Sequence, residues 1–392
     1  MSRQLHVAML SHTATPDAPT GAERSLALLA AGLRKRGARV AVAAPGAWSL
    51  AGELRDAGVE VAEISCRACW MTYHDPLAWP LAALKWARFA LPDPGRPRLA
   101  RWLRGRAPDV VHVNCLPHLR GAEAARATGL PVIWHLREIL PPGRRRRWFA
   151  ARLERDASRI VAVSEAVGGW VRDEGLGERL DVVPNGVAPA PPRAEDPGPA
   201  RRALSIPEEG FLVGMFGQLL PHTGGPQFVR AARLALERQP GLRFLLAGPG
   251  PPGFIAALRD AARSGEGPER IHVIPPQPSA EPLLAAMDAV CRPTLPPDPF
   301  PRSILEAMAA GLPVAAFRGG GVAEMVRDGE SGLLAEPGDV EALARAFVRL
   351  AGDPEAARAM GRAGRRRATD EFTIERHVDR MERLLRAAAG KP

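Results

Sequence analysis

A pair of carboxylates near an expected helix start is the part of this sequence best suited to chemistry. The stretch DPFPRSILEAMAAGLPVAAFRGGG, residues 298–321, begins with Asp298 in a proline-containing loop and continues to Glu306 on the expected helix. A carboxylate at Glu306 can accept two hydrogen bonds from a ribose diol, and one at Asp298 can accept them from sugar hydroxyls. The alternative is an ordinary exposed helix acid and an ordinary turn residue.

The same stretch predicts an anion site at the start of a helix over residues 301–310. The first N–H groups of a helix have no carbonyl partner within it and carry the positive end of the helix dipole. A diphosphate can therefore bind at such a helix end. The residues that would form this site are Phe300, Pro301, Arg302, Ser303 and Ile304.

Glycine-containing turns follow three expected strands in the C-terminal half. They contain Gly214 and Gly217, then Gly248 and Gly250, then Gly319 to Gly321. A glycine lets the backbone approach a ligand closely, and a following helix start offers N–H groups to an anion. Helix packing also uses glycine, but three such turns in one domain favour a phosphate-containing ligand.

Short apolar runs alternate with longer amphipathic ones, which is typical of parallel sheets with crossover helices. A helix is expected over 22–36, because its leucines recur at helical spacing. Strands are expected at 5–10, 39–44, 59–64, 109–114, 131–136 and 159–164, and later in FLVGMF, RFLLAG, RIHVIP, DAVCRP and PVAAF. The predicted fold class is α/β, with two doubly wound, Rossmann-like domains.

A proline-rich, charged segment separates the two sets of strands. We expect an N-terminal domain over 1–187, a linker over 188–210 and a C-terminal domain over 211–372. A helix over 373–392 closes the chain, and packing against the N-terminal domain is one option for it. Ligands of doubly wound sheets bind beyond the carboxyl ends of the strands, so we expect a site in a cleft between two facing domains.

Charge is distributed unevenly along the 392 residues. Residues 1–190 hold 27 basic and 18 acidic side chains, whereas the whole chain has a net charge of +10. This asymmetry indicates either an anionic partner for the N-terminal half or a solvated arginine-rich surface. Nucleic acid is not expected as the partner, because the chain has one tyrosine and no recognisable nucleic-acid-binding module.

Compartment and metal content can also be predicted from the sequence. No 18-residue apolar stretch could span a bilayer, and the start MSRQLHVAML has no cleavable leader pattern. Cys66 and Cys69 form a single CxxC pair, whereas a structural zinc needs four ligands. We therefore expect a cytoplasmic protein without a metal site.

Taken together, these motifs resemble the retaining glycosyltransferases of family 4, also called group 1, which have the GT-B fold. The resemblance extends over nearly the whole chain. It is carried by TGAERSLALLAAGLRKRGARV, VIWHLRE, VSEAVGGWV with VVPNGV, GQLLPHTGGPQFVRAARL, LLAGPG, and the long stretch from Asp298 to DGESGLLAEPGD. It implies transfer of a sugar from a nucleotide-sugar to an acceptor hydroxyl with retention of configuration, and it implies no metal ion or other cofactor.

The resemblance also implies roles for individual residues. Asp298, where the family usually has Glu, would contact the donor sugar, and Glu306 would contact the ribose. His135 would lie near the donor sugar and the reaction centre. The diphosphate and base would be bound by the following positions, partly through their backbone: Gly21, Gln218, Thr223, Gly224, Gly248, Ile274 and Gln277.

One departure from the family pattern concerns the diphosphate. The family's donor loop normally reads G-R-L-x-x-x-K-G, whereas this chain has GQLLPHTG, with Gln218 and Thr223 at the two cationic positions. Each charge-assisted hydrogen bond contributes about 1.5–3 kcal/mol, so an uncompensated loss would be severe. Our hypothesis is that Arg302 supplies one missing charge, with His222 as the weaker candidate.

Two segments of the N-terminal half combine aromatic and basic residues. They are PLAWPLAALKWARFALP (76–92), with Trp79, Trp86 and Phe89, and GRRRRWF (143–149). Such segments can lie on an anionic membrane surface, or they can be buried aromatics beside a solvated charge run. In this family the N-terminal domain binds the acceptor, often lipid-linked, which would place the protein on the inner face of the cell membrane.

The leading interpretation is thus an enzyme that builds a surface polysaccharide or glycolipid. A nucleotide-sugar-binding pseudoenzyme or scaffold is the alternative suggested by Gln218 and Thr223. A GT-B epimerase or phosphorylase is a further alternative, although the NGV strand and the EAMAAGLPV helix fit family 4 better. The donor sugar, the base and the acceptor are not determined by these motifs.

Overall fold

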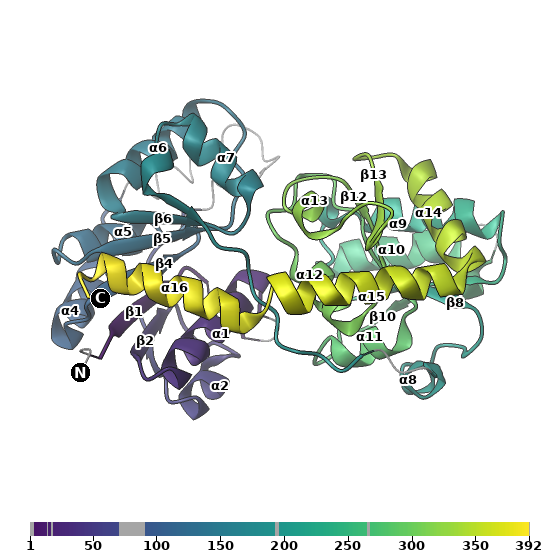
Figure 1. Ribbon diagram of the computed structural model, residues 1–392, viewed down its shortest axis with the longest axis horizontal. Coiled ribbons are helices and arrows are strands. Elements are labelled where there is room, and N and C mark those ends of the chain that lie inside the picture. The colour runs from purple at the N-terminus through teal and green to yellow at the C-terminus, as the bar shows by residue number, and fades with distance from the viewer. Residues whose placement is uncertain are drawn as a thin grey trace. The chain divides into compact units, whose positions relative to one another are not determined.

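The computed structural model describes residues 4–13, 15–16, 19–69, 91–192, 196–264 and 267–391. Contacts divide the chain into two units, Met1–Gly186 with Ile374–Pro392, and Val187–Thr373. Each unit is built on one parallel sheet (Figure 1). The predicted α/β class with two doubly wound parallel sheets is confirmed.

The first unit has a seven-stranded sheet in the order β3-β2-β1-β4-β5-β6-β7. Its strands are β1 (His6–Ser11), β2 (Arg39–Ala44), β3 (Glu60–Glu63), β4 (Val110–Asn114), β5 (Val132–Leu136), β6 (Arg159–Ala162) and β7 (Leu180–Val182). Its helices are α1 (Gly21–Lys35), α2 (Ala51–Asp56), α4 (Gly95–Arg106), α5 (Leu119–Arg126), α6 (Arg144–Asp156), α7 (Glu165–Asp173) and α16 (Ile374–Ala388). The central strands are buried on both faces, as expected for a parallel sheet.

The last helix of the chain completes the core of this first unit. Val378, Met381 and Leu385 of α16 are buried in the same apolar cluster as the leucines of α1. Gly32 of α1 lies directly under Val378, where a Cβ would collide with the valine side chain. Figure 1 shows α16, at the yellow end of the colour scale, lying along this unit.

The second unit has a six-stranded sheet in the order β10-β9-β8-β11-β12-β13. Its strands are β8 (Phe211–Phe216), β9 (Leu242–Ala247), β10 (Ile271–Ile274), β11 (Ala289–Arg292), β12 (Val314–Phe317) and β13 (Gly332–Ala335). Its helices are α8 (Gly198–Ala203), α9 (Gly225–Leu236), α10 (Pro252–Arg263), α11 (Glu281–Ala286), α12 (Arg302–Ala310), α13 (Val322–Met325), α14 (Val340–Gly352) and α15 (Pro354–Glu371). The segment expected as a linker, 188–210, contains α8 and lies in this unit.

An aromatic cluster forms the centre of the second core. Phe228 of α9, Phe244 of β9 and Phe347 of α14 pack with ring centroids 5.4–5.9 Å apart. Edge-on packing of this kind adds about 0.5–1.5 kcal/mol per pair beyond burial.

Among the described residues, no helix is both long enough and apolar enough to cross a lipid bilayer.

Candidate active site

The sheet order of the second unit identifies where a ligand would bind. β8 and β11 are neighbours, while β9 and β10 continue the sheet on one side and β12 and β13 on the other. The connections therefore diverge at the carboxyl ends of β8 and β11, which is the topological switch point of an open α/β sheet. The loops at this point hold the donor-loop motif after β8 and Asp298 after β11.

The donor loop after β8 is closed by its own threonine. The Thr223 hydroxyl donates to the carbonyl of Leu220 over 2.8 Å and accepts from the Leu220 N–H over 3.0 Å. Thr223 is buried, whereas Gln218 is exposed. The residue at the position where the family has a lysine is thus engaged in holding the turn, and it carries no charge.

Two glycines hold the loops of the switch point against each other. Gly224 has φ +90°, and a Cβ there would collide with the carbonyl oxygen of Pro293. Gly248 has φ +156°, and a Cβ there would collide with the carbonyl of Gly217. The donor loop therefore packs backbone to backbone on the segment after β11 and on the segment after β9.

Helix α12 begins as the sequence predicted, with an uncapped N-terminus. Pro301 is the N-cap and makes no side-chain cap hydrogen bond, and Ser303 and Ile304 are buried in the first turn. Arg302 and Glu306 share one face and pair with each other, Nη2 to Oε1, over 3.0 Å. Their side chains are 12% and 25% exposed, so Arg302 does not extend freely into solvent.

Asp298 has a partner that the sequence analysis did not identify. Arg292, the last residue of β11, donates from Nε (3.3 Å) and Nη2 (2.9 Å) to Oδ2 of Asp298. The two side chains are 14% and 12% exposed. A charged residue at the end of the apolar run DAVCRP is the signal that could have indicated Arg292.

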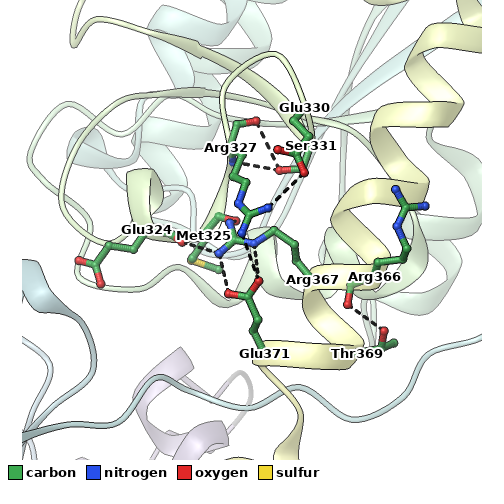
Figure 2. A network of polar contacts seen from close by, with 9 residues as sticks. All are labelled: Glu324, Met325, Arg327, Glu330, Ser331, Arg366, Arg367, Thr369 and Glu371. Atoms are coloured by element: carbon green, nitrogen blue, oxygen red, sulfur yellow. Dashed lines mark hydrogen bonds and ion pairs between the residues drawn. The ribbon is translucent and has the colours of Figure 1, made fainter.

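The glycine triplet and the end of α15 support the Asp298 loop. The N–H of Gly321 donates to the Asp298 carbonyl over 2.9 Å, and Phe300 packs edge-on against Phe372 at 5.6 Å. Figure 2 shows how Arg367 of α15 donates to the carbonyls of Glu324 and Met325 at α13 and pairs with Glu371. The loop that carries Asp298 is thus positioned by contacts to α13 and α15.

The two residues expected near the base lie at the end of the edge strand β10 and just after it. Ile274 ends that strand, and the Gln277 amide donates to the Pro275 carbonyl over 3.1 Å. Both belong to the carboxyl edge of the same sheet as the donor loop, since all six strands are parallel. Their contact with a base stays a prediction.

In the first unit, Gly21 is the exposed first residue of α1. The N-cap Thr20 and Glu23 form a capping box, with Glu23 N–H to Thr20 Oγ1 at 3.3 Å and Thr20 N–H to Glu23 at 2.8 Å. The buried Glu23 carboxylate also accepts from the N–H and hydroxyl of Thr15. This bonding fixes the loop that precedes the helix and leaves Gly21 at its surface.

His135 lies inside the sheet of the first unit. It lies within β5 with 0% exposure, its Nδ1 is 3.2 Å from Nε2 of His112, and its ring stacks on His377 at 6.0 Å. Burial lowers the pKa of His135 well below its usual value, so the ring is neutral. The place near the donor sugar that the resemblance implies for His135 stays a prediction.

The side chain just beyond the end of β5 is Arg137. It donates from Nε to Asn114 (2.9 Å) at the end of β4 and from Nη1 to Asn185 (2.6 Å) after β7. The next residue, Glu138, accepts from the N–H groups of Arg137 and Leu116, and burial raises its pKa to about 7. Arg137 and Glu138 therefore form the polar part of the carboxyl edge of this sheet.

The two aromatic and basic segments are only partly described. Residues 76–90, with Trp79, Trp86 and Phe89, lie outside the described residues. The other segment begins α6, where Arg144, Arg145 and Arg147 are exposed, while Arg146 pairs with Glu174 over 2.6 Å.

No three His, Cys, Asp or Glu side chains converge as metal ligands in the described part of the chain.

Two parallel-sheet domains, one of them with a helix N-terminus at a switch point, are typical of nucleotide-binding α/β proteins. Residues 20–186 match the family model "Glycosyl transferase 4-like domain", and residues 210–353 match "Glycosyl transferases group 1". These two matches together cover most of the chain, which belongs to the group 1, or family 4, glycosyltransferases.

Relatives agree with this assignment. The chain is 36% identical over 194 residues to D-inositol 3-phosphate glycosyltransferase of Acidothermus cellulolyticus, covering 44% of this chain and 40% of that protein. It is 32% identical to 2-deoxystreptamine glucosyltransferase of Streptomyces kanamyceticus, covering 58% of this chain and 59% of that protein. The matched region thus spans less than two thirds of either relative.

Solved structures show the same fold over the whole length. Alr3699/HepE of Anabaena, solved in complex with UDP-glucose, has a TM-score of 0.81 at 23% identity and covers 98% of this chain and 100% of that one. Sucrose-phosphate synthase of Thermosynechococcus elongatus has a TM-score of 0.76 at 18% identity, covering 98% and 99%. The predicted GT-B fold is confirmed.

Proposed function

We propose that this protein transfers a sugar from a nucleotide-sugar donor to an acceptor hydroxyl, with retention of the anomeric configuration. The observation that carries the proposal is the uncapped start of α12 between Asp298 and Glu306, at the switch point of the second sheet. The similar Alr3699/HepE structure contains UDP-glucose, and the relatives named above are glycosyltransferases by name.

In the proposed site the diphosphate lies at the first N–H groups of α12. Glu306 accepts hydrogen bonds from the ribose, and Asp298 accepts them from the sugar hydroxyls. Backbone N–H groups and arginine stabilise the charge that develops on the leaving diphosphate, which is a task that a metal ion performs in other transferases. Fixed dipoles of this kind need little reorganisation when the glycosidic bond breaks.

Retention follows from attack on the face that the diphosphate leaves. The bond between the anomeric carbon and the diphosphate oxygen breaks, and the acceptor oxygen forms a bond to the same face of that carbon. The acceptor proton passes to the departing diphosphate oxygen, so no carboxylate nucleophile is required. We further propose an acceptor in a surface polysaccharide or glycolipid, bound by the first unit at the edge that contains Arg137 and Glu138.

Nucleotide-sugars should stabilise the protein against thermal unfolding. Unfolding would be followed by fluorimetry with UDP-, GDP-, ADP- and TDP-sugars, and a ligand at about 100 times its Kd should add about 2.7 kcal/mol. Transfer by the stabilising donor, assayed with and without a chelator, would be followed by NMR of the product anomer. Stabilisation without transfer would instead support a nucleotide-binding scaffold, and an inverted product would contradict the proposed mechanism.

Attachment to an anionic membrane is proposed for α6. Its first turn contains no acidic residue and exposes Arg144, Arg145 and Arg147, although cations at a helix N-terminus are electrostatically unfavourable. A binding role would account for this arrangement. Trp148 lies partly exposed beside them, with Arg152 stacked 4.3 Å from its ring centroid.

Replacing Arg144, Arg145 and Arg147 by glutamine should weaken binding to anionic vesicles. Each basic residue near such a surface contributes about 1 kcal/mol, so the triple variant should lose about 100-fold in affinity. Flotation with phosphatidylglycerol and with phosphatidylcholine vesicles measures this difference. The control replaces three exposed arginines of the second unit, Arg345, Arg358 and Arg362. No binding by the unaltered protein, or an equal loss in the control, would contradict a membrane surface on α6.

A further inference from the structure

The donor site as described lacks the positive charge that its ligand requires. A nucleotide diphosphate carries two to three negative charges, and Gln218 and Thr223 stand where the family has arginine and lysine. The Thr223 hydroxyl closes its own turn. Helix dipoles contribute only partial charges, so a permanent cation close to the switch point is still needed.

Neither cation suggested by the sequence fills this role unaided. The Arg302 guanidinium is paired with Glu306 on the same face of α12. Arg292 is likewise paired with Asp298, so the two arginines differ in position and not in the net charge of their pairs. His222, in the donor loop, is an exposed residue. Partial desolvation lowers its pKa, and the Arg292 guanidinium lowers it further against the opposing effect of Asp298. His222 is therefore neutral at pH 7 in the unliganded protein.

Arg292 lies where the missing charge is needed. It ends β11, the strand next to β8, and the following residue, Pro293, is the one on which Gly224 of the donor loop packs. Arg292 is therefore close to both loops that the proposed diphosphate would contact.

The bonding of Arg292 leaves donors for a ligand. A guanidinium has five N–H donors in a planar arrangement, and Asp298 engages only Nε and Nη2 among the described residues. One residue beyond Pro293, the Thr294 hydroxyl is buried without a hydrogen bond in the described part of the chain.

We propose that Arg292 binds the donor diphosphate through its remaining donors while it holds Asp298 for the sugar. One guanidinium would then connect the leaving group to the carboxylate that orients the transferred sugar. It replaces the loop cations that Gln218 and Thr223 do not supply. This inference rests on the proposed function. It adds to the proposed donor site a residue that lies outside the donor-loop motif.

The test separates the diphosphate from the rest of the nucleotide. Binding of UDP, UMP and uridine would be measured by calorimetry for the unaltered protein, Arg292→Gln and Arg292→Lys. The same comparison of diphosphate, monophosphate and nucleoside would be made for the GDP and ADP series. Arg292→Gln should lower the affinity for the diphosphate about 10- to 100-fold and leave that for the nucleoside within about twofold. Arg292→Lys should recover part of the loss, because it keeps the charge without the planar donor arrangement.

The matched control is Arg358→Gln, an arginine of α15 at the amino-terminal edge of the same sheet, near Phe211 and Asp288. It should bind each nucleotide as the unaltered protein does. If Arg292→Gln keeps its diphosphate affinity but loses affinity for UDP-glucose alone, Arg292 acts only through Asp298 and the inference is wrong. If the unaltered protein binds none of the diphosphates, the proposed function fails instead. Circular dichroism of each variant checks that it is folded.

Discussion

Asp298→Asn is expected to lower the rate of sugar transfer about 100- to 1,000-fold. The carboxylate would accept hydrogen bonds from the donor sugar, and these bonds strengthen as positive charge develops at the anomeric carbon. Losing one preorganised electrostatic contact of this kind costs about this factor in other enzymes. The amide oxygen of Asn can still accept from Arg292, so the loop itself should keep its conformation.

The rate and the nucleotide affinity should respond differently to this change. Affinity for UDP, which has no sugar, should stay within about threefold, while kcat falls. Asp298→Glu restores a carboxylate and should recover much of the activity. Asp328→Asn, at an exposed aspartate that pairs with Arg318 over 2.7 Å, is the matched control. Equal activity of Asp298→Asn and the control would remove Asp298 from the site.

Acidification from pH 7 to pH 5 is expected to destabilise the first unit by several kcal/mol. Burial lowers the pKa of His12 to about 4 and those of His112 and His118 to about 3, and it holds that of His135 well below its usual value. These rings stay neutral in the folded state, whereas the unfolded chain protonates them below about pH 6.5. The unfolded state then binds more protons, so stability falls as the pH falls.

The titration of Glu138 opposes this loss of stability on acidification. Its pKa is raised to about 7 by burial, so the folded state takes up a proton at Glu138 that the unfolded state takes up only near pH 4.5. That uptake offsets roughly one of the four histidines, each of which contributes about 2 kcal/mol by pH 5. The net loss is large compared with the 5–15 kcal/mol of a typical domain.

Hydrogen exchange at pH 7 and pH 5, corrected for intrinsic rates, measures this effect separately in each unit. The second unit is an internal control, because the two histidines there whose pKa values are lowered are less buried: His222 is exposed and His272 is half-buried. Protection in β4 and β5 should decrease much more than protection in β8 and β9. Equal protection of β4 and β5 at the two pH values would show that the buried histidines do not control stability.

The fold was predictable because its signal is local and repeated. Apolar runs bounded by glycine and amphipathic helices recur along both halves, and parallel sheets follow from that alternation. The start of α12 was predictable for the same reason, since Pro301 and the following apolar spacing are sequence features. The Arg292–Asp298 pair was not predictable, because it depends on how the loop after β11 folds back on the strand.

The burial of His135 could not be predicted from the sequence either. A strand in the centre of a parallel sheet is buried on both faces, so alternation does not indicate which of its side chains reach a ligand. The histidine of VIWHL lies inside the sheet against His112 and His377, and the residue beyond the strand end is Arg137. Likewise, the sequence does not show that the Thr223 hydroxyl is engaged by Leu220.

The position of α16 has a consequence for how the chain is made. Val378, Met381 and Leu385 belong to the core of the first unit, although they are synthesised after the whole of the second. During translation, the unit that emerges first thus exposes an apolar groove until residues 374–388 leave the ribosome, while the continuous second unit can fold before them. A nascent or shortened chain that stops near residue 373 would present that groove to chaperones and proteases.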